Sequence, residues 1–459
     1  PGTVPAYSNY GATLAGYIVQ RVSGVPFEKY IDENIFKPLG MTHSSFAQPL
    51  PKELAPLMSA GYMRGSEEAK PFEMVAPFPA GSLASSAGDM TRFIIAHLNN
   101  GQFENERILK SETATLMHTR QFGLDPALNG MACGFYEESR NGHRIIGHGG
   151  DTVYFHSDLH LVLDAGVGFF VSYNSAGRGQ GNLRSQLWYA FLDRYFPFTP
   201  PSEPAVSTAK ADADIVAGKY IVSRREDTSF LKPLYLLSEF TVDKKDDGTI
   251  QVDQITGFNG QPKTWREIGP LKYREVDGQD MLAFKRDHDR LMLALDIPIE
   301  AGQRVGASEN GGLVLPVVVI ALAIMLLTLV LWPIGWLVRR HYGKPLASNP
   351  QEKRLRVVTR LVLVLDLVFF VGLICIIAYG FEHLWVLNER LDTWIHLSQV
   401  IGVIGAVGTV AIGLNTIVSW VSKRKGIWTK LGDTVIFFAC LVFVWFAVTQ
   451  HLLNFTLRY

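Results

Sequence analysis

Four long apolar segments in the last third of the chain limit what it can fold into. They cover residues 313–338, 357–379, 394–421 and 431–453 of a chain of 459 residues. Each is long enough to cross the hydrocarbon core of a bilayer, which takes about 20 helical residues. We therefore predict an all-α membrane domain over residues 311–459, with four transmembrane helices.

The loops between these segments predict their orientation. Basic residues fill the first and third loops, at Arg339, Arg340, Lys344, Lys353, Arg354, Arg356, Lys423, Arg424, Lys425 and Lys430. The middle loop carries Glu382, Glu389 and Asp392 against Arg390 alone. Basic loops stay on the cytoplasmic side of a membrane, so everything before residue 313 is expected outside.

Composition excludes several classes of function. The chain holds 43 Lys and Arg against 43 Asp and Glu, so no basic excess would attract a nucleic acid. Three cysteines, Cys133, Cys375 and Cys440, lie far apart, which disfavours a disulfide framework or a cysteine zinc site. Walker-type loops, H-E-x-x-H and G-x-S-x-G are absent, and neither a metal nor a cofactor is expected.

The part before the membrane segments divides at a proline-rich run, residues 197–204. Proline interrupts both helices and central strands, so we place a linker at 197–213. Residues 214–305 alternate apolar and polar positions in short segments, which predicts a small antiparallel β domain. Residues 1–196 mix helix and strand patterns and predict an α/β or α+β domain. The chain opens at Pro1 without an initiator Met, as a piece of a longer polypeptide would.

Several short motifs in this first domain carry the functional information. Tyr7-Ser8-Asn9 precedes a helical pattern, and Gly147-His148-Gly149-Gly150-Asp151 enters an extended one. With residues 36–41 and 79–90 between them, their order resembles the serine β-lactamase and penicillin-binding-protein superfamily, in its class C β-lactamase, esterase and D-aminopeptidase branch. The resemblance covers residues 1–196 and implies a β-lactamase-like fold that is incomplete at its N-terminus.

The resemblance also implies a role for each residue of the two motifs. Tyr7 is similar to the family's general base, and Asn9 to its substrate-orienting amide. His148 stands where the family has Lys or His. Gly149 and Gly150 would let a substrate approach the strand, and the Asp151 N–H would form half of an oxyanion hole.

One family motif, the S-x-x-K that holds the nucleophile, does not precede Tyr7. The family's motif order would put it upstream of Pro1, so we expect this chain alone to be inactive. Matches at Ser207–Lys210, Ser229–Lys232 and Ser422–Lys425 fall in the linker, the β domain and a cytoplasmic loop. A four-residue pattern with two free positions recurs by chance, so we interpret all three as coincidence.

Other polar residues have weaker claims to a function. His156 and His160 lie in an extended pattern, where strand geometry would hold them about 13 Å apart, too far to share a metal. Asp366 lies inside the second apolar segment, as either a relay group or a contact between helices. Gly402, Gly405 and Gly408 in the third segment are expected to allow close helix packing.

Two functions from different classes follow from these patterns. The first is a multi-pass protein of a bacterial cytoplasmic membrane with an extracytoplasmic serine hydrolase domain, acting through an acyl-enzyme on cell-wall D-Ala peptides, esters or β-lactams. The second is a non-catalytic extracytoplasmic ligand-binding or sensor protein coupled to the helix bundle, because four spans exceed what an anchor needs. A transporter is weaker, since the spans hold few ionisable groups. Besides the bilayer and the substrate, the sequence indicates no partner.

Overall fold

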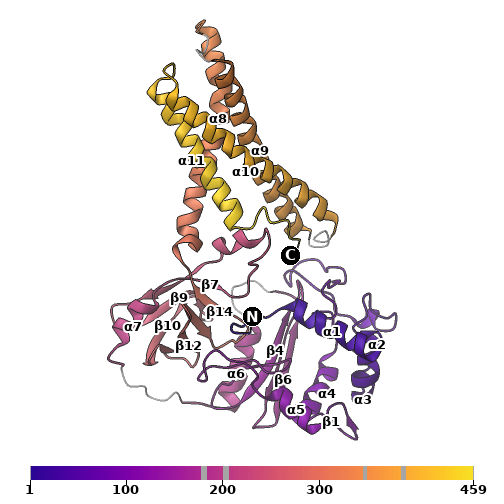
Figure 1. The fold of residues 1–459 in the computed structure, drawn as a ribbon. Coiled ribbons are helices and arrows are strands. Elements are labelled where there is room, and N and C mark those ends of the chain that lie inside the picture. The colour runs from indigo at the N-terminus through magenta and orange to yellow at the C-terminus, as the bar shows by residue number, and fades with distance from the viewer. Residues whose placement is uncertain (1, 177–182, 200–205, 345–348, 384–388, 458–459) are drawn as a thin grey trace. The chain divides into compact units, whose positions relative to one another are not determined.

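The chain forms two compact units, which Figure 1 draws as a ribbon. The computed structural model describes residues 2–176, 183–199, 206–344, 349–383 and 389–457. The first unit comprises Pro1–Arg224 and Phe240–Val305, and the second comprises Arg225–Glu239 and Gly306–Tyr459.

The first domain is built on an antiparallel four-stranded sheet in the order β3-β4-β5-β6. Its strands are β3 (Tyr136–Glu137), β4 (Ile145–Asp151), β5 (His156–Val162) and β6 (Val167–Tyr173). The longer helices are α1 (Asn9–Ser23), α4 (Ala87–Leu98), α5 (Ser111–His118) and α6 (Leu183–Tyr195). Shorter elements are α2 (Phe27–Ile31), a π-helical turn (Asp32–Phe36), α3 (Lys37–Leu39), η2 (Ala55–Leu57), β1 (Gln102–Phe103) and β2 (Glu106–Arg107).

Alternating side chains let this sheet form a core on both of its faces. Ile146 and Leu161 are fully buried in one cluster together with Ile94 of α4. Their sequence neighbours Ile145 and Val162 are fully buried in a second cluster with Trp188 and Leu192 of α6. Successive strand residues point to opposite faces, so the sheet is packed between α4 and α6.

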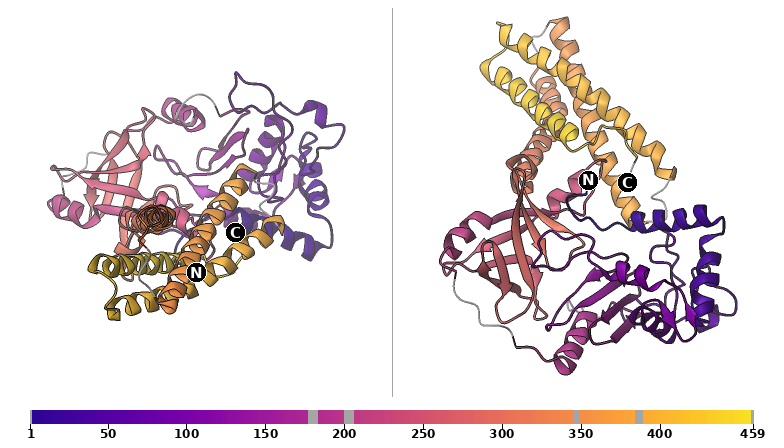
Figure 2. Two further views of the ribbon diagram at one scale, coloured as in Figure 1. Left: turned by 90° about the horizontal axis from the view of Figure 1, so that it is seen from above. Right: turned by 60° about the horizontal axis from the view of Figure 1, so that its bottom comes forward.

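The second domain of this unit is a closed antiparallel barrel, seen from two further directions in Figure 2. Its order is β10-β11-β12-β13-β14-β7-β8-β9. The strands are β7 (Gly218–Val222), β8 (Phe240–Lys244), β9 (Ile250–Thr256), β10 (Pro262–Gly269), β11 (Lys272–Glu275), β12 (Met281–Asp287), β13 (Arg290–Leu295) and β14 (Ala301–Arg304). Large aromatic side chains, among them Tyr220, Trp265 and Tyr273, are buried in its core. A barrel of this size is filled by its own side chains.

The barrel is fixed to the first domain by polar contacts. The Arg140 guanidinium lies 2.6 Å from the Asp280 carboxylate, and the Asn129 side-chain amide donates to Asp296 over 3.0 Å. These contacts come from the loops around β3 and from the barrel strands and turns. They explain why the two domains form one unit although a linker separates them in sequence.

The second unit contains four long helices: α8 (Gly311–His341), α9 (Pro350–Glu382), α10 (Glu389–Val421) and α11 (Ile427–Thr449). All four are long and apolar enough to cross a membrane. The unit also includes η3 (Lys232–Leu237) and η4 (Ala307–Glu309). In η3, the Lys232 ammonium donates to the Thr449 carbonyl at the end of α11 over 3.0 Å. Segment 225–239, which the sequence assigned to the β domain, therefore packs with the helices.

The predicted combination of an α/β domain, an antiparallel β domain and a four-helix membrane region is confirmed. Two details differ from the sequence analysis. Helix α7 (Ala209–Val216) crosses the expected boundary at residue 213, because Ala213 and Val216 are buried in the barrel core. The last span ends at Thr449 rather than 453, since His451 takes a left-handed conformation with φ of 59°.

Candidate active site

Tyr7 is held in place from two sides. Its backbone N–H donates to the Ile299 carbonyl, in the segment between β13 and β14 of the barrel, over 2.9 Å. The next residue, Ser8, caps α1, because its hydroxyl accepts the Gly11 N–H over 3.2 Å. Ser8 is thus the N-cap of α1. Asn9 is the first residue of α1 and is exposed.

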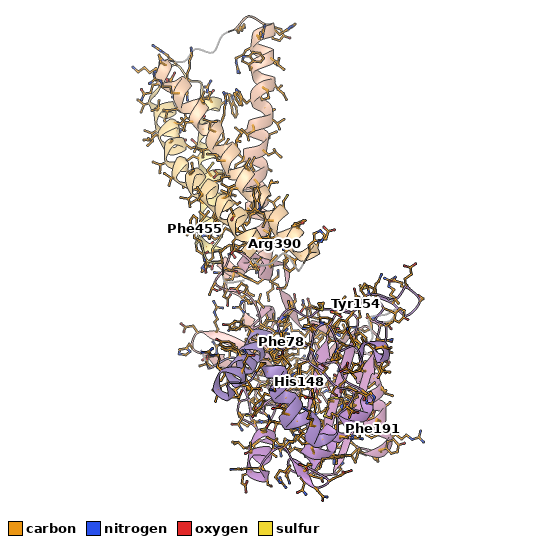
Figure 3. The ribbon with its side chains drawn as sticks, turned by 90° about the vertical axis from the view of Figure 1, so that its right-hand side faces the viewer. Phe78, His148, Tyr154, Phe191, Arg390 and Phe455 are labelled. Carbon is orange, nitrogen blue, oxygen red and sulfur yellow. The ribbon has the colours of Figure 1, made fainter. Side chains whose placement is uncertain are left out.

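His148 of β4 lies beside Tyr7, although 141 residues separate the two. The Tyr7 hydroxyl and the His148 Nε2 are 3.4 Å apart, and the ring centroids are 5.8 Å apart. Burial lowers the pKa of the His148 imidazole, with a smaller opposing effect from its contact to Gly149. A largely neutral imidazole next to a phenol can accept or return a proton. Figure 3 labels His148 among the side chains of the first domain.

A cation reaches Tyr7 from the barrel. The Arg224 guanidinium lies 5.2 Å from the centre of the Tyr7 ring, within the range of a cation–π contact. Arg224 follows β7, and the neighbouring Ser223 hydroxyl donates to the Pro5 carbonyl. Burial raises the pKa of the nearby Glu300 carboxyl, and Arg224 opposes that shift. No motif surrounds this arginine, so it could not be singled out from the sequence.

The two glycines after His148 face opposite sides of the sheet. A methyl group added at Gly149 would fall 2.6 Å from the Asp158 Oδ1 and 3.1 Å from the Tyr136 hydroxyl. A methyl group at Gly150 would meet nothing within 4 Å. The space beside Gly150 is therefore open, whereas Gly149 makes room for Asp158 and Tyr136. The Gly149 N–H donates to the Tyr136 hydroxyl at the edge of the sheet.

The Asp151 carboxylate is occupied by partners in the protein. Arg184 of α6 donates to it over 3.0 Å, and the His156 Nδ1 lies 2.6 Å from it. Arg184 also donates to the Gly150 carbonyl over 3.1 Å and lies 3.4 Å from Asp158. Burial raises the pKa of Asp158 to about 6, and Arg184 opposes the shift. Any role of residue 151 in an oxyanion hole thus rests on its backbone N–H.

A cavity of about 1100 Å³ opens beside this strand. Its wall includes His148, Gly150 and Asp151 from β4 and the loop that follows. The rest of the lining mixes apolar, small polar and charged side chains, among them Phe72, Phe93, Phe135, Phe155, Phe170, Ser82, Ser85, Ser157, Asn174, Lys70, Glu73 and Asp158. The volume is that of a typical small-molecule site. Tyr7 does not line the cavity, but it contacts His148, which does.

Comparisons with known proteins identify the family that the first domain resembles. The profile of the Beta-lactamase family matches residues 1–189. The first domain belongs to the serine β-lactamase and penicillin-binding-protein superfamily. It is similar to the putative penicillin-binding protein PbpX of Bacillus subtilis, with 42% identity over 89 residues, which cover 19% of this chain and 22% of PbpX. It is also similar to a putative D-alanyl-D-alanine carboxypeptidase of Escherichia coli K12, with 27% identity over 158 residues, 29% of this chain and 36% of the relative.

The chain thus spans between about a fifth and a third of the length of these curated relatives. Among solved structures, SurE matches with a TM-score of 0.42 and 20% identity over 66% of this chain and 69% of SurE. The octameric penicillin-binding protein homologue from Pyrococcus abyssi matches with a TM-score of 0.36 and 19% identity over 66% of each chain. Residues 1–189 are thus similar to a serine-hydrolase-like domain of this superfamily.

The three internal S-x-x-K sequences lie in other surroundings. Ser229 is fully buried in segment 225–239, and Lys232 binds the end of α11. Lys425 lies 2.9 Å from the Asp433 carboxylate in the helical unit. The remaining match, residues 207–210, leads into α7 beside the barrel. Among the described residues, none of these serines has a hydrogen bond to Tyr7 or His148.

The two histidines of β5 have separate partners. The His160 Nδ1 lies 2.5 Å from the Glu138 carboxylate, and its ring stacks on Trp188 with centroids 4.1 Å apart. His156 contacts Asp151 instead. In the described part of the chain, no group of three or more His, Cys, Asp or Glu side chains is placed to hold a metal ion.

Proposed function

We propose that this chain is part of a membrane-bound serine hydrolase that works through an acyl-enzyme on the outer face of a bacterial cytoplasmic membrane. The observation that carries the proposal is the Tyr7 and His148 pair, 3.4 Å apart beside a cavity of about 1100 Å³. The basic loops after α8 and α10 support the orientation.

The nucleophilic serine and its lysine would come from a segment upstream of Pro1. Tyr7 would take the proton of the serine hydroxyl while the serine oxygen bonds to the substrate carbonyl carbon. The proton would then pass to the leaving amine or alcohol, and water would release the acyl group by the same route in reverse. His148 would exchange protons with Tyr7, and the cation–π contact of Arg224 would hold the Tyr7 ring in place.

The Asp151 N–H and the N–H of the serine would stabilise the oxyanion that forms during acylation. Both N–H groups would have to point at one position, which the open space at Gly150 permits. Asn9, exposed at the start of α1, would orient the substrate amide.

The substrates we propose are D-Ala-containing cell-wall peptides, D-alanyl esters or simple esters, with β-lactams less favoured. A permanent positive charge at the position of His148 would favour the carboxylate of a β-lactam, whereas burial lowers the pKa of the His148 imidazole and favours its neutral form. The D-alanyl-D-alanine carboxypeptidase relative supports the peptide class.

The test uses protein expressed from the complete reading frame that contains this chain. Purified protein is given a D-Ala-D-Ala peptide, a D-alanyl ester, a simple ester and a β-lactam. Turnover is measured, and trapped acyl-enzyme is sought by mass spectrometry. We expect Tyr7→Phe to lower kcat by about 10²–10⁴-fold, the usual contribution of a general base. Tyr10→Phe is the matched control, because Tyr10 lies on α1 with 73% of its surface exposed.

Equal activity of Tyr7→Phe and Tyr10→Phe would remove Tyr7 from the mechanism. If no substrate class were turned over and no acyl-enzyme formed, the hydrolase proposal would be wrong. The second candidate, a ligand-binding protein without turnover, would then lead. It is favoured by one observation: the chain has four helices long and apolar enough to cross a membrane, more than an anchor needs.

A further inference from the structure

Asp366 lies at the middle of the contact between α9 and α10. Its side chain is fully buried, and neither carboxylate oxygen has a hydrogen-bond partner among the described residues. It faces Gly405, where an added methyl group would fall 2.0 Å from the Asp366 Oδ1. Gly402 and Gly408 pack in the same close manner against Phe369 and Val362. The glycines of α10 thus let the two helices approach around the carboxylate, as the sequence predicts for these positions.

Further polar side chains are buried along α10. They are Ser398, Gln399, Thr409, Asn415, Thr416 and Ser419. Both polar atoms of Gln399, the Asn415 Oδ1 and the Ser419 Oγ have no partner among the described residues. Gln399 and Ser419 are about 30 Å apart along a helix that rises about 1.5 Å per residue, a distance equal to the thickness of the hydrocarbon core.

Some of these side chains join the helices through hydrogen bonds. The Thr416 hydroxyl donates to the carbonyls of Ile412 in α10 and Asp433 in α11, and the Ser398 hydroxyl donates to the carbonyl of Phe369 in α9. Asp366, Gln399 and Ser419 make no such bond within the described ranges. Apolar side chains of similar size would pack at these positions without the cost of burying polar atoms. A series of unpartnered polar groups through a membrane helix therefore calls for a ligand that they can bind.

We propose that Asp366 is the proton-binding site of a polar path that crosses the membrane along α10. A proton entering from one side would form an O–H bond on the carboxylate, and its release to the other side would break that bond. Amide and hydroxyl groups both donate and accept hydrogen bonds, so Gln399, Asn415 and Ser419 can bind the water molecules that carry the proton. A metal ion is a poorer fit, since no group of three or more ionisable ligands surrounds Asp366 in the described residues.

The inference does not depend on the hydrolase activity, only on the helices crossing a membrane. The full chain is reconstituted into liposomes that contain a pH-sensitive dye, and a potassium gradient with valinomycin drives proton entry. We expect faster acidification than in protein-free liposomes. Asp366→Asn should reduce the rate to that of protein-free liposomes. Glu382→Gln, which neutralises an exposed carboxylate at the end of the same helix, should leave the rate unchanged.

A second measurement covers the case in which Asp366→Asn fails to fold, judged by circular dichroism and size-exclusion chromatography. Dicyclohexylcarbodiimide modifies protonated carboxyl groups in membranes, and peptide mass spectrometry locates the modification. We expect the wild-type chain to be modified at Asp366, with loss of proton flux. The proposal is overturned if wild-type flux equals that of protein-free liposomes, if folded Asp366→Asn keeps the wild-type flux, or if modification of Asp366 leaves the flux intact.

Discussion

Gly149 and Gly150 offer a sharp test of how the sheet is built at the active site. The same substitution, glycine to alanine, is made at two adjacent positions of β4. At Gly149 the new methyl group would lie 2.6 Å from the Asp158 Oδ1, and at Gly150 it would meet nothing within 4 Å. Neither glycine has a positive φ, so alanine fits the backbone at both positions.

The expected magnitudes follow from these distances. Asp158 cannot move away easily, because it is buried and lies 3.4 Å from Arg184. Overpacking of this kind costs about 1–3 kcal/mol, and alanine returns about 0.5–1 kcal/mol by restricting the unfolded chain. Gly149→Ala should therefore lower the free energy of unfolding by about 1–2 kcal/mol. Gly150→Ala should raise it by about 0.5 kcal/mol, since only the second effect applies.

The assay is pulse proteolysis of the full chain in mild detergent over a urea series, with fragments of the first unit followed on gels. The wild-type chain and both variants are compared under one set of conditions. Equal stability of the two variants, or a less stable Gly150→Ala, would refute the assignment of the two glycines to opposite faces. A second readout uses protein from the complete reading frame: if the proposed hydrolase activity is present, Gly150→Ala should lower turnover of bulky substrates, because Gly150 lines the cavity.

Two further predictions concern charge in the first unit. Burial lowers the pKa of the His97 imidazole to about 4. Below pH 6.5 the unfolded chain therefore binds a proton that the folded chain does not. The free energy of unfolding should fall by up to about 3 kcal/mol as the pH falls from 6.5 toward 4. The free energy of unfolding is measured at each pH for the wild-type chain and for His97→Leu, which should remove this dependence. Subtracting the two values cancels the opposite contribution of Asp158, which both chains share. A difference in free energy that does not change with pH would contradict the prediction. Asp280→Asn should destabilise the unit by about 3 kcal/mol, because Arg140 and Lys263, at 2.6 and 2.5 Å from Asp280, would lose their buried partner. If urea titration showed a loss of unfolding free energy below about 0.5 kcal/mol, as is typical of a surface substitution, the contacts of Asp280 with Arg140 and Lys263 would be solvated rather than buried.

Local patterns were sufficient for much of the fold. The four spans follow from apolar length alone, a property of each segment by itself. The strands of the barrel, β7 to β14, all lie within residues 214–305, where the alternation of apolar and polar positions predicts an antiparallel β domain. The motifs at Tyr7 and His148 could be singled out because their residue types and order are typical of one superfamily.

Only the tertiary structure decided how these parts meet. Arg224 reaches Tyr7 because the barrel closes and binds the Tyr7 backbone at Ile299, and nothing near Arg224 in sequence indicates that contact. The surroundings of Gly149 and Gly150 differ because of β5 and α6. Asp158 of β5 lies next to Gly149, and Arg184 of α6 lies 3.4 Å from Asp158. Segment 225–239 packs with the helices rather than with the barrel strands that flank it. Periodicity and composition indicate the secondary structure that a segment favours locally. These contacts instead join residues that are distant in sequence, so they exist only once the chain has folded.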